Sequence, residues 1–190
     1  MKKSFLILVV AACATFTANA QKISFGVKGG LNIAKLTDYD NSKVRASIFA
    51  GGYANFAFNE NLSVQPELLY SGQGNKYEVL NTDFTNKLGY INIPVMVQYR
   101  IVPEFYLEAG PQLGFLASAK TKSGKVTVDI KDDCKTVDFG LGFGVGYQFS
   151  NGFGIGGRYM FGLTKVSEDE NLKRKNSVAQ IGVFYTFNHK

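Results

Sequence analysis

Apolar and polar residues alternate along most of this 190-residue chain. In the stretch 105–119, Phe105 and Leu107 belong to an apolar set at every second position, and Glu108 and Gln112 belong to the set between them. Successive side chains of a β-strand point to opposite faces, so a period of two indicates strands with one apolar and one polar face. A chain built from such strands needs an apolar environment on one side of its sheet and a polar one on the other.

The same rhythm predicts eight strands, with bounds 22–34, 46–58, 62–75, 88–101, 105–120, 136–149, 153–164 and 176–187. Three connections are short and carry turn-forming residues: 59–61, 102–104 and 150–152. The other four are long and polar: 35–45, 76–87, 121–135 and 165–175. Short and long connections alternate, as they do in outer-membrane barrels with short periplasmic turns and long external loops. We therefore predict an all-β fold, an eight-stranded antiparallel up-and-down transmembrane β-barrel.

Two features test this interpretation. The segment 139–157 has no charge and is long enough to cross a membrane as a helix, but glycines alternate with apolar residues from Phe139 to Tyr147. Two strands joined at Asn151-Gly152 explain it better, and the inward glycines would leave room for large side chains such as Tyr53, Tyr106 or Arg158. Three prolines inside predicted strands should cause bulges or local loss of pairing: Pro66, Pro94 and Pro111.

The first twenty residues have the features of a secretory signal peptide. A basic start precedes an apolar core over 5–12, and Ala18-Asn19-Ala20 forms a small-x-small cleavage site. We predict a signal peptide over 1–20 and a barrel domain over 21–190, located in the outer membrane of a Gram-negative envelope. A lipoprotein signal with Cys13 as the lipidated residue is the alternative. If Cys13 is removed, Cys134 remains as a single cysteine and no intrachain disulfide can form.

The polar face of the predicted strands carries four charges: Lys28, Glu67, Glu108 and Arg158. An eight-stranded barrel has an interior only just wide enough for its own side chains. Charges buried there must pair or be hydrated, because an isolated buried charge is very costly. We predict an internal ionic network in which Glu67 and Glu108 pair with Arg158 and Lys28. A structural plug is the favoured role, and a gate or proton path is the alternative.

The sequence predicts no catalytic, cofactor or metal site. A Ser-His-acid enzyme needs a base that exchanges its proton near neutral pH, but His189 is the only histidine and follows the last strand. The glycine pattern over 152–157 runs into a strand and not into the helix that a dinucleotide needs. Asp129 and its neighbours lack the spacing of a calcium loop. The net charge of +6 is scattered, without a basic motif for nucleic acid.

Five segments resemble the PorT-like outer-membrane β-barrel domain, also called a porin-family small barrel: "LSVQPELLYSGQG" (62–74), "YINIPVMVQYR" (90–100), "FYLEAGPQLGFLASAK" (105–120), "DFGLGFGVGYQF" (138–149) and "GRYMFGLTKV" (157–166). The resemblance implies an eight-stranded outer-membrane barrel; its founding member belongs to a protein-secretion and gliding apparatus. The alternating C-terminal strand from Ile181 to Phe187 resembles the signal that barrel-assembly machinery reads.

The favoured interpretation is a non-enzymatic structural or interaction barrel whose external loops contact envelope proteins, within an envelope or secretion assembly. Its expected surroundings are outer-membrane lipid and, during biogenesis, the assembly machinery. A narrow gated porin for small solutes or ions is the main alternative. A soluble lipocalin-like barrel is a further alternative, and it requires the apolar face to point inward.

Overall fold

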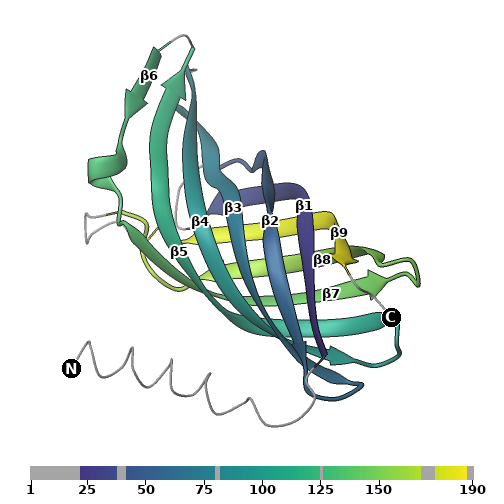
Figure 1. Cartoon of the computed structure of the whole chain (residues 1–190). Helices are drawn as coiled ribbons and strands as arrows, with labels where there is room; N and C mark the ends of the chain where they lie inside the picture. Colours follow the sequence, from purple (N-terminus) through teal and green to yellow (C-terminus); the bar gives the residue numbers. More distant parts are fainter. Residues whose placement is uncertain (1–21, 38–41, 80–81, 125, 168–173, 188–190) are drawn as a thin grey trace, which may run out of the picture.

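The computed structural model describes residues 22–37, 42–79, 82–124, 126–167 and 174–187 (Figure 1). These residues form nine strands and a short 3-10 helix: β1 (Lys22–Leu36), β2 (Arg45–Ala57), β3 (Leu62–Val79), β4 (Thr82–Arg100), β5 (Phe105–Ser123), β6 (Val126–Asp129), η1 (Lys131–Asp133), β7 (Val137–Gln148), β8 (Phe153–Gly162) and β9 (Asn176–Phe187). The expected signal peptide and Cys13 lie outside the described residues, as does His189.

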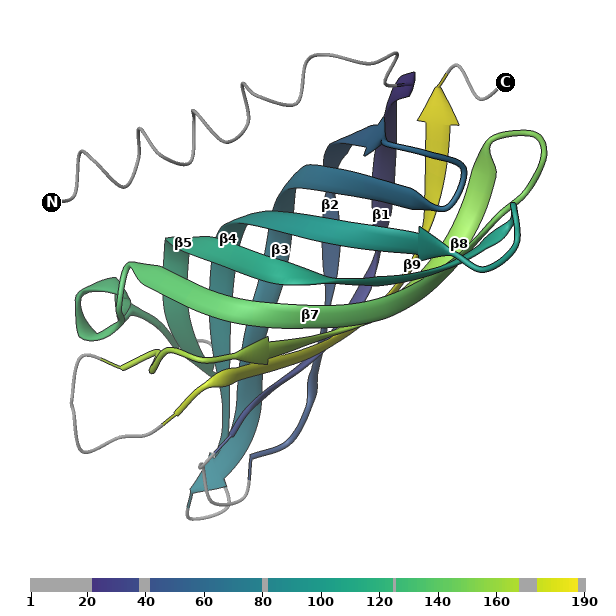
Figure 2. The same cartoon turned by 90° about the horizontal axis from the view of Figure 1, so that it is seen from below.

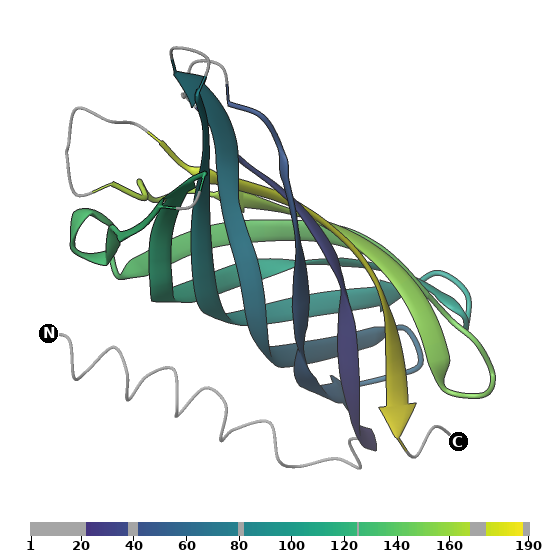
Figure 3. The ribbon, with the colours of Figure 1, turned by 90° about the horizontal axis from the view of Figure 1, so that it is seen from above.

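Eight of the strands close into a ring. The strand order is β4-β3-β2-β1-β9-β8-β7-β5, every pair is antiparallel, and β4 also pairs with β5. Figures 2 and 3 show this ring from opposite sides, with its strands strongly tilted. The ninth strand, β6, is not part of the ring, because within the described chain it pairs only with the end of β5. The predicted eight-stranded up-and-down barrel is confirmed.

The two faces of the sheet are those expected for a membrane barrel. The outward side chains of β1 are apolar and exposed, with Phe25 and Leu31 both more than half exposed, whereas Asn32, next to Leu31, is fully buried. From Ile23 to Ile33 the strand covers about 34 Å, or about 26 Å at a tilt of ~40°, close to the ~25 Å apolar band of outer-membrane barrels. The soluble alternative with an apolar interior is therefore wrong. None of the described residues forms a helix with the length and hydropathy to cross a membrane.

One long loop was predicted wrongly. The segment 76–87 is not a loop, because β3 and β4 continue through it as a paired hairpin up to Val79↔Thr82. Tyr77 and Phe84 stack across this hairpin with ring centroids 5.2 Å apart. The hairpin, the end of β5 and β6 extend beyond the ring, at the end opposite to the short turns (Figure 1). The predicted loop 121–135 likewise contains the end of β5, then β6 and η1.

The prolines interrupt pairing without shifting the register. Between the pairs Pro94↔Gln112 and Val97↔Ala109, two residue pairs that include Pro111 drop out of the β4–β5 ladder. Similar gaps adjoin Pro66 on both of its sides. The predicted local loss of pairing is thus observed, since proline has no N–H to donate. The one register shift in β4–β5 lies elsewhere, between Gly89 and Tyr90.

Candidate functional site in the barrel interior

The structure brings the four charged side chains of the sequence analysis together at mid-barrel. The Arg158 guanidinium, on β8, donates to both carboxylate oxygens of Glu67, on β3, over 2.9 and 2.8 Å. Its Nε donates to Glu108 on β5 over 2.7 Å. Lys28 on β1 completes the group through a 3.0 Å ion pair with Glu67. Two cations and two carboxylates balance, and we call these four residues the ionic layer.

The ionic layer is almost dry, and neighbouring amides satisfy its remaining oxygens. The Glu67 side chain is fully buried, and those of Arg158 and Glu108 are 4% and 5% exposed. Gln65 donates to Glu67 over 2.8 Å, and Gln98 donates to Glu108 over 3.1 Å. Buried ion pairs offset their desolvation only when such additional hydrogen bonds are present. Six hydrogen bonds or ion pairs therefore hold these charges in one arrangement.

An aromatic layer closes the barrel next to the ionic layer, on the side of the short turns. Phe184 lies between Tyr53 and Tyr106, with ring centroids 6.4 and 6.3 Å from theirs. Glycines on the wall make the room: a Cβ at Gly146 would lie 2.2 Å from the Tyr106 ring. The equivalent glycine opposite the Tyr53 ring is Gly26 on β1, at 2.2 Å.

The space left around these two layers is too small for a solute. A cavity of about 20 Å³ adjoins Lys28, Glu108 and Arg158. A buried water occupies roughly 30 Å³ of liquid volume and needs only part of that as free space, so this cavity holds one water at most. The arrangement fits the predicted plug, and a role as plug or gate stays a prediction.

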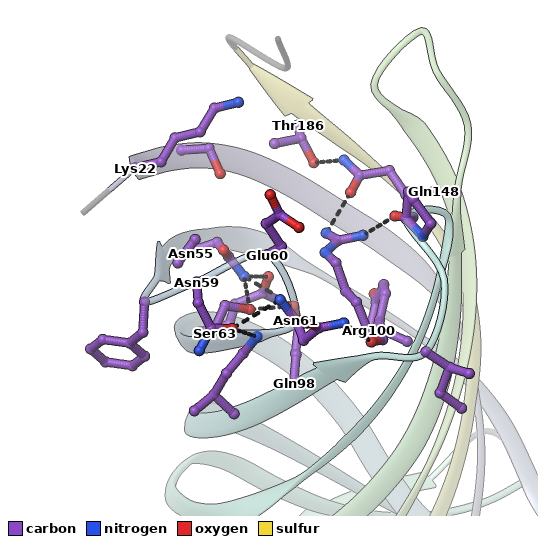
Figure 4. A pocket seen from close by; sticks show the side chains of 18 of the residues that line it. Lys22, Asn55, Asn59, Glu60, Asn61, Ser63, Gln98, Arg100, Gln148 and Thr186 are labelled. Atoms are coloured by element: carbon purple, nitrogen blue, oxygen red, sulfur yellow. Dashed lines mark hydrogen bonds between the residues drawn. The ribbon is translucent and has the colours of Figure 1, made fainter. Parts of the chain in front are cut away.

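A much larger cavity of about 680 Å³, lined by both polar and apolar side chains, opens at the short-turn end, and we call it the vestibule. Figure 4 shows its polar side chains from several strands and turns. Arg100 donates to Gln148 over 2.8 Å, and Gln148 donates to Thr186 over 2.8 Å. Thr186 in turn shares a 2.7 Å hydrogen bond with the Tyr53 hydroxyl of the aromatic layer. The vestibule is therefore a blind cavity that ends at the aromatic layer.

The opposite end of the interior is also filled. Asp138 accepts from Asn176 over 3.0 Å and from the Thr164 hydroxyl. Beyond this group, buried apolar side chains from three strands and the β8–β9 connection pack together: Leu36, Leu88, Tyr90, Leu116, Ala119 and Val166. Cys134 packs against this cluster. The interior thus has a closed external end and an open vestibule.

Sequence reasoning named the four charged residues but missed several interior groups. Arg100, Asp138 and Phe184 were not singled out, although Arg100 shares its face with Gln98 and could have been found by alternation. The glycine pattern over 152–157 is a tight turn at Gly152 followed by β8, as expected. Across the described residues, no group of three or more His, Cys, Asp or Glu side chains is placed to hold a metal ion.

Comparisons with known proteins agree with this architecture. Neisserial surface protein A is 19% identical, with a TM-score of 0.56 over 87% of this chain and 99% of that one. Ail, the attachment invasion locus protein of Yersinia pestis, is 18% identical, with a TM-score of 0.50 over 86% of this chain and 98% of that one. Another structure of Ail, in complex with the heparin analogue sucrose octasulfate, is 17% identical, with a TM-score of 0.50, and covers 87% of this chain and 99% of that one. These likenesses concern the fold.

A comparison with curated proteins gave no match. The family model described as "Outer membrane protein beta-barrel domain" matches residues 19–168, which is most of the chain. Nothing in that match or in the structural neighbours points to catalysis. The chain therefore belongs to the outer membrane protein beta-barrel domain family and is a small outer-membrane β-barrel protein.

Proposed function

We propose that this protein is a closed interaction barrel, which anchors an external binding surface in the outer membrane. The observation that carries the proposal is the filled interior. The ionic layer leaves a cavity of about 20 Å³, so the barrel body offers no passage, and its external surface is the part free to act. The barrel then serves as a rigid base for its loops. Binding residues commonly lie on loops that a rigid scaffold holds in position.

The external surface contains an open sheet edge. The ends of β3, β4 and β5 extend beyond the ring, and β6 adds a strand that pairs with β5 alone among the described residues. Val126 and Val128 on β6 are 65% and 54% exposed. An exposed edge of this kind accepts a further strand from another protein, because it presents unpaired backbone groups next to apolar side chains. We infer that an envelope protein pairs with β6.

The likeness to PorT-like barrels supports a narrower form of the same proposal, in which that partner is a component of a protein-secretion assembly. The experiment is photo-crosslinking in intact cells from Thr127, the β6 residue between the two valines. We expect a protein adduct that disappears when Val126 and Val128 are both changed to lysine, because edge lysines oppose strand addition. The matched control is Val102→Lys at an exposed short turn, which should keep the adduct. An adduct that survives the β6 substitutions would refute the proposal.

A gated pore is the second candidate, and the vestibule is the observation that favours it. The vestibule brings solvent as far as Tyr53 and Tyr106, directly beside the ionic layer. A continuous path would then require the ionic layer, the aromatic layer and the apolar cluster at the external end to rearrange together. Single-channel recording of the purified protein separates the two candidates: the closed barrel predicts no reproducible conductance, and a conductance that Arg158→Ala alters would support the pore instead.

A further inference from the structure

The exposed apolar side chains on the outer wall form a band around the barrel, which we call the apolar belt. Four lysines lie on the outward face of the sheet, just beyond this belt on the external side. They are Lys76 on β3, Lys87 on β4, and Lys120 and Lys122 on β5, and we call them the lysine patch. We propose that the lysine patch binds the phosphate group of an anionic lipid in the outer leaflet. The barrel would then carry a lipid-binding site on its outer wall, separate from its interior and from the β6 edge.

The strand register places the four lysines in two adjacent rows. Lys87 lies directly opposite Lys120, and one step further out Lys76 and Lys122 both lie opposite Thr85. Adjacent strands are about 4.8 Å apart, and the rows about 7 Å, so the patch measures roughly 10 by 7 Å. A surface cavity of about 450 Å³ is lined by Lys76, Lys87 and Lys122, together with Arg45. Three of the four lysines and Arg45 therefore border one surface space, and Lys120 lies next to it, opposite Lys87.

Like charges directly across a strand pair are destabilising, so the Lys87↔Lys120 pair calls for a counterion. Within the described chain, no carboxylate forms an ion pair with any member of the lysine patch. The nearby acids are few: Asp83 lines the same cavity, and Asp129 on β6 lies opposite Lys120. Glu78 is already paired with Lys43 at 3.1 Å. The patch keeps a positive excess that a phosphate would neutralise.

The height of the patch on the barrel identifies the occupant. The side chains point outward, because their strand neighbours Asn86, Leu88 and Ala119 are buried. The apolar belt below ends at Ile91 on β4 and Phe115 on β5, which pair with each other. Four residues along β4 from Ile91 to Lys87 rise about 10 Å at a tilt of ~40°. Headgroups extend roughly 5–7 Å beyond the hydrocarbon core, so lysine side chains at this level reach them.

A lipid is favoured over a soluble anion by this position. The patch faces the bilayer laterally, and a lipid phosphate is held there at high local concentration by its own acyl chains. Basic residues at a membrane surface attract anionic headgroups by about 1 kcal/mol each, which corresponds to about fivefold in association. Two lysines removed together should thus produce an effect that is easily measured.

The test uses the full-length barrel reconstituted in phosphatidylcholine vesicles that contain spin-labelled phosphatidic acid. Electron paramagnetic resonance gives the association constant of this lipid relative to spin-labelled phosphatidylcholine. We expect the wild type to prefer phosphatidic acid. In the double variant Lys87→Gln/Lys120→Gln, the relative association constant of this lipid should fall by about fivefold for each lysine removed. The control Lys131→Gln/Lys135→Gln removes the same charge from the η1 region and should retain the preference. Heat-modifiable gel mobility checks that each variant is folded.

Three results would overturn the proposal. One is a wild type without preference for the phosphate-bearing lipid. Another is an equal loss in the control variant, which would mean that net charge alone is responsible. The last is binding of inorganic phosphate at Lys87 and Lys120 in a protein that binds phosphatidic acid no better than phosphatidylcholine. The patch would then recognise a soluble anion and not a lipid.

Discussion

Removing Arg158 should be among the most damaging single changes in this barrel. Its guanidinium makes three charge-assisted hydrogen bonds to Glu67 and Glu108, whose side chains are at most 5% exposed. In Arg158→Ala, Glu67 keeps its 3.0 Å ion pair with Lys28, whereas Glu108 loses its only ion pair among the described residues. Breaking a buried pair on one side costs about 3–5 kcal/mol. Because one carboxylate keeps a partner, we expect a loss of about 4 kcal/mol in the free energy of unfolding.

Urea titration of the barrel in phospholipid vesicles, followed by tyrosine fluorescence and heat-modifiable gel mobility, would measure this loss. The matched control neutralises the whole ionic layer: Lys28→Met, Glu67→Gln, Glu108→Gln and Arg158→Met together. Replacing every member of a buried ionic group by neutral residues of similar size is often nearly neutral. We expect this variant to unfold within about 2 kcal/mol of the wild type. A loss below about 1 kcal/mol in Arg158→Ala would refute the reasoning, since the carboxylates would then be hydrated.

Three further changes use the same unfolding measurement. Gly146→Ala places a Cβ 2.2 Å from the Tyr106 ring and should lower the free energy of unfolding by about 1–3 kcal/mol. The control Gly156→Ala, whose Cβ would lie 3.3 Å from its nearest atom, should lower it less. Equal effects would contradict the packing argument. Asn32→Leu should cost about 1–3 kcal/mol, because the buried Gln180 amide loses its acceptor while the Gly72 carbonyl keeps the Ser47 hydroxyl; an unchanged midpoint would show that water replaces the lost partner. Replacing 77–84 by an Asn-Gly turn should leave the free energy of unfolding within about 1 kcal/mol, since the described residues of this segment, 77–79 and 82–84, lie beyond the ring; a larger loss would show that the hairpin supports the barrel.

The membrane-spanning part of the fold could be predicted because lipid selects one face of every strand. Leu31 is 59% exposed and its neighbour Asn32 is fully buried, and the alternation of apolar and polar residues follows that difference directly. Beyond the bilayer the outward face of a strand meets water instead of lipid, so its residues no longer need to be apolar. Thr85 and Asn86 therefore show no contrast in polarity, although only Asn86 is buried, and the hairpin around them was predicted as a loop.

The members of the ionic layer could be named from the sequence, but their detailed partners depend on how the barrel closes. Arg158 on β8 meets Glu67 on β3 across the ring, and no local spacing encodes that distance. The same holds for the room around the aromatic layer. The glycines of β7 were expected to accommodate Tyr53 and Tyr106 alike, yet Gly26 on β1 accommodates Tyr53. Alternation gives the direction of a side chain, whereas the stagger between strands decides what it meets.

The ionic layer also disfavours a register slip between neighbouring strands. A slip of one residue between neighbouring strands turns every side chain of one strand to the other face. On β8 a slip would move Arg158 into lipid and Tyr159 and Phe161 into a filled interior, where the 20 Å³ cavity has no room for them. An arginine on the lipid face costs about 2–4 kcal/mol at the bilayer midplane, and the stranded Glu67 and Glu108 add to it. The quadruple neutral variant should therefore keep its stability but fold with less uniform strand pairing than the wild type.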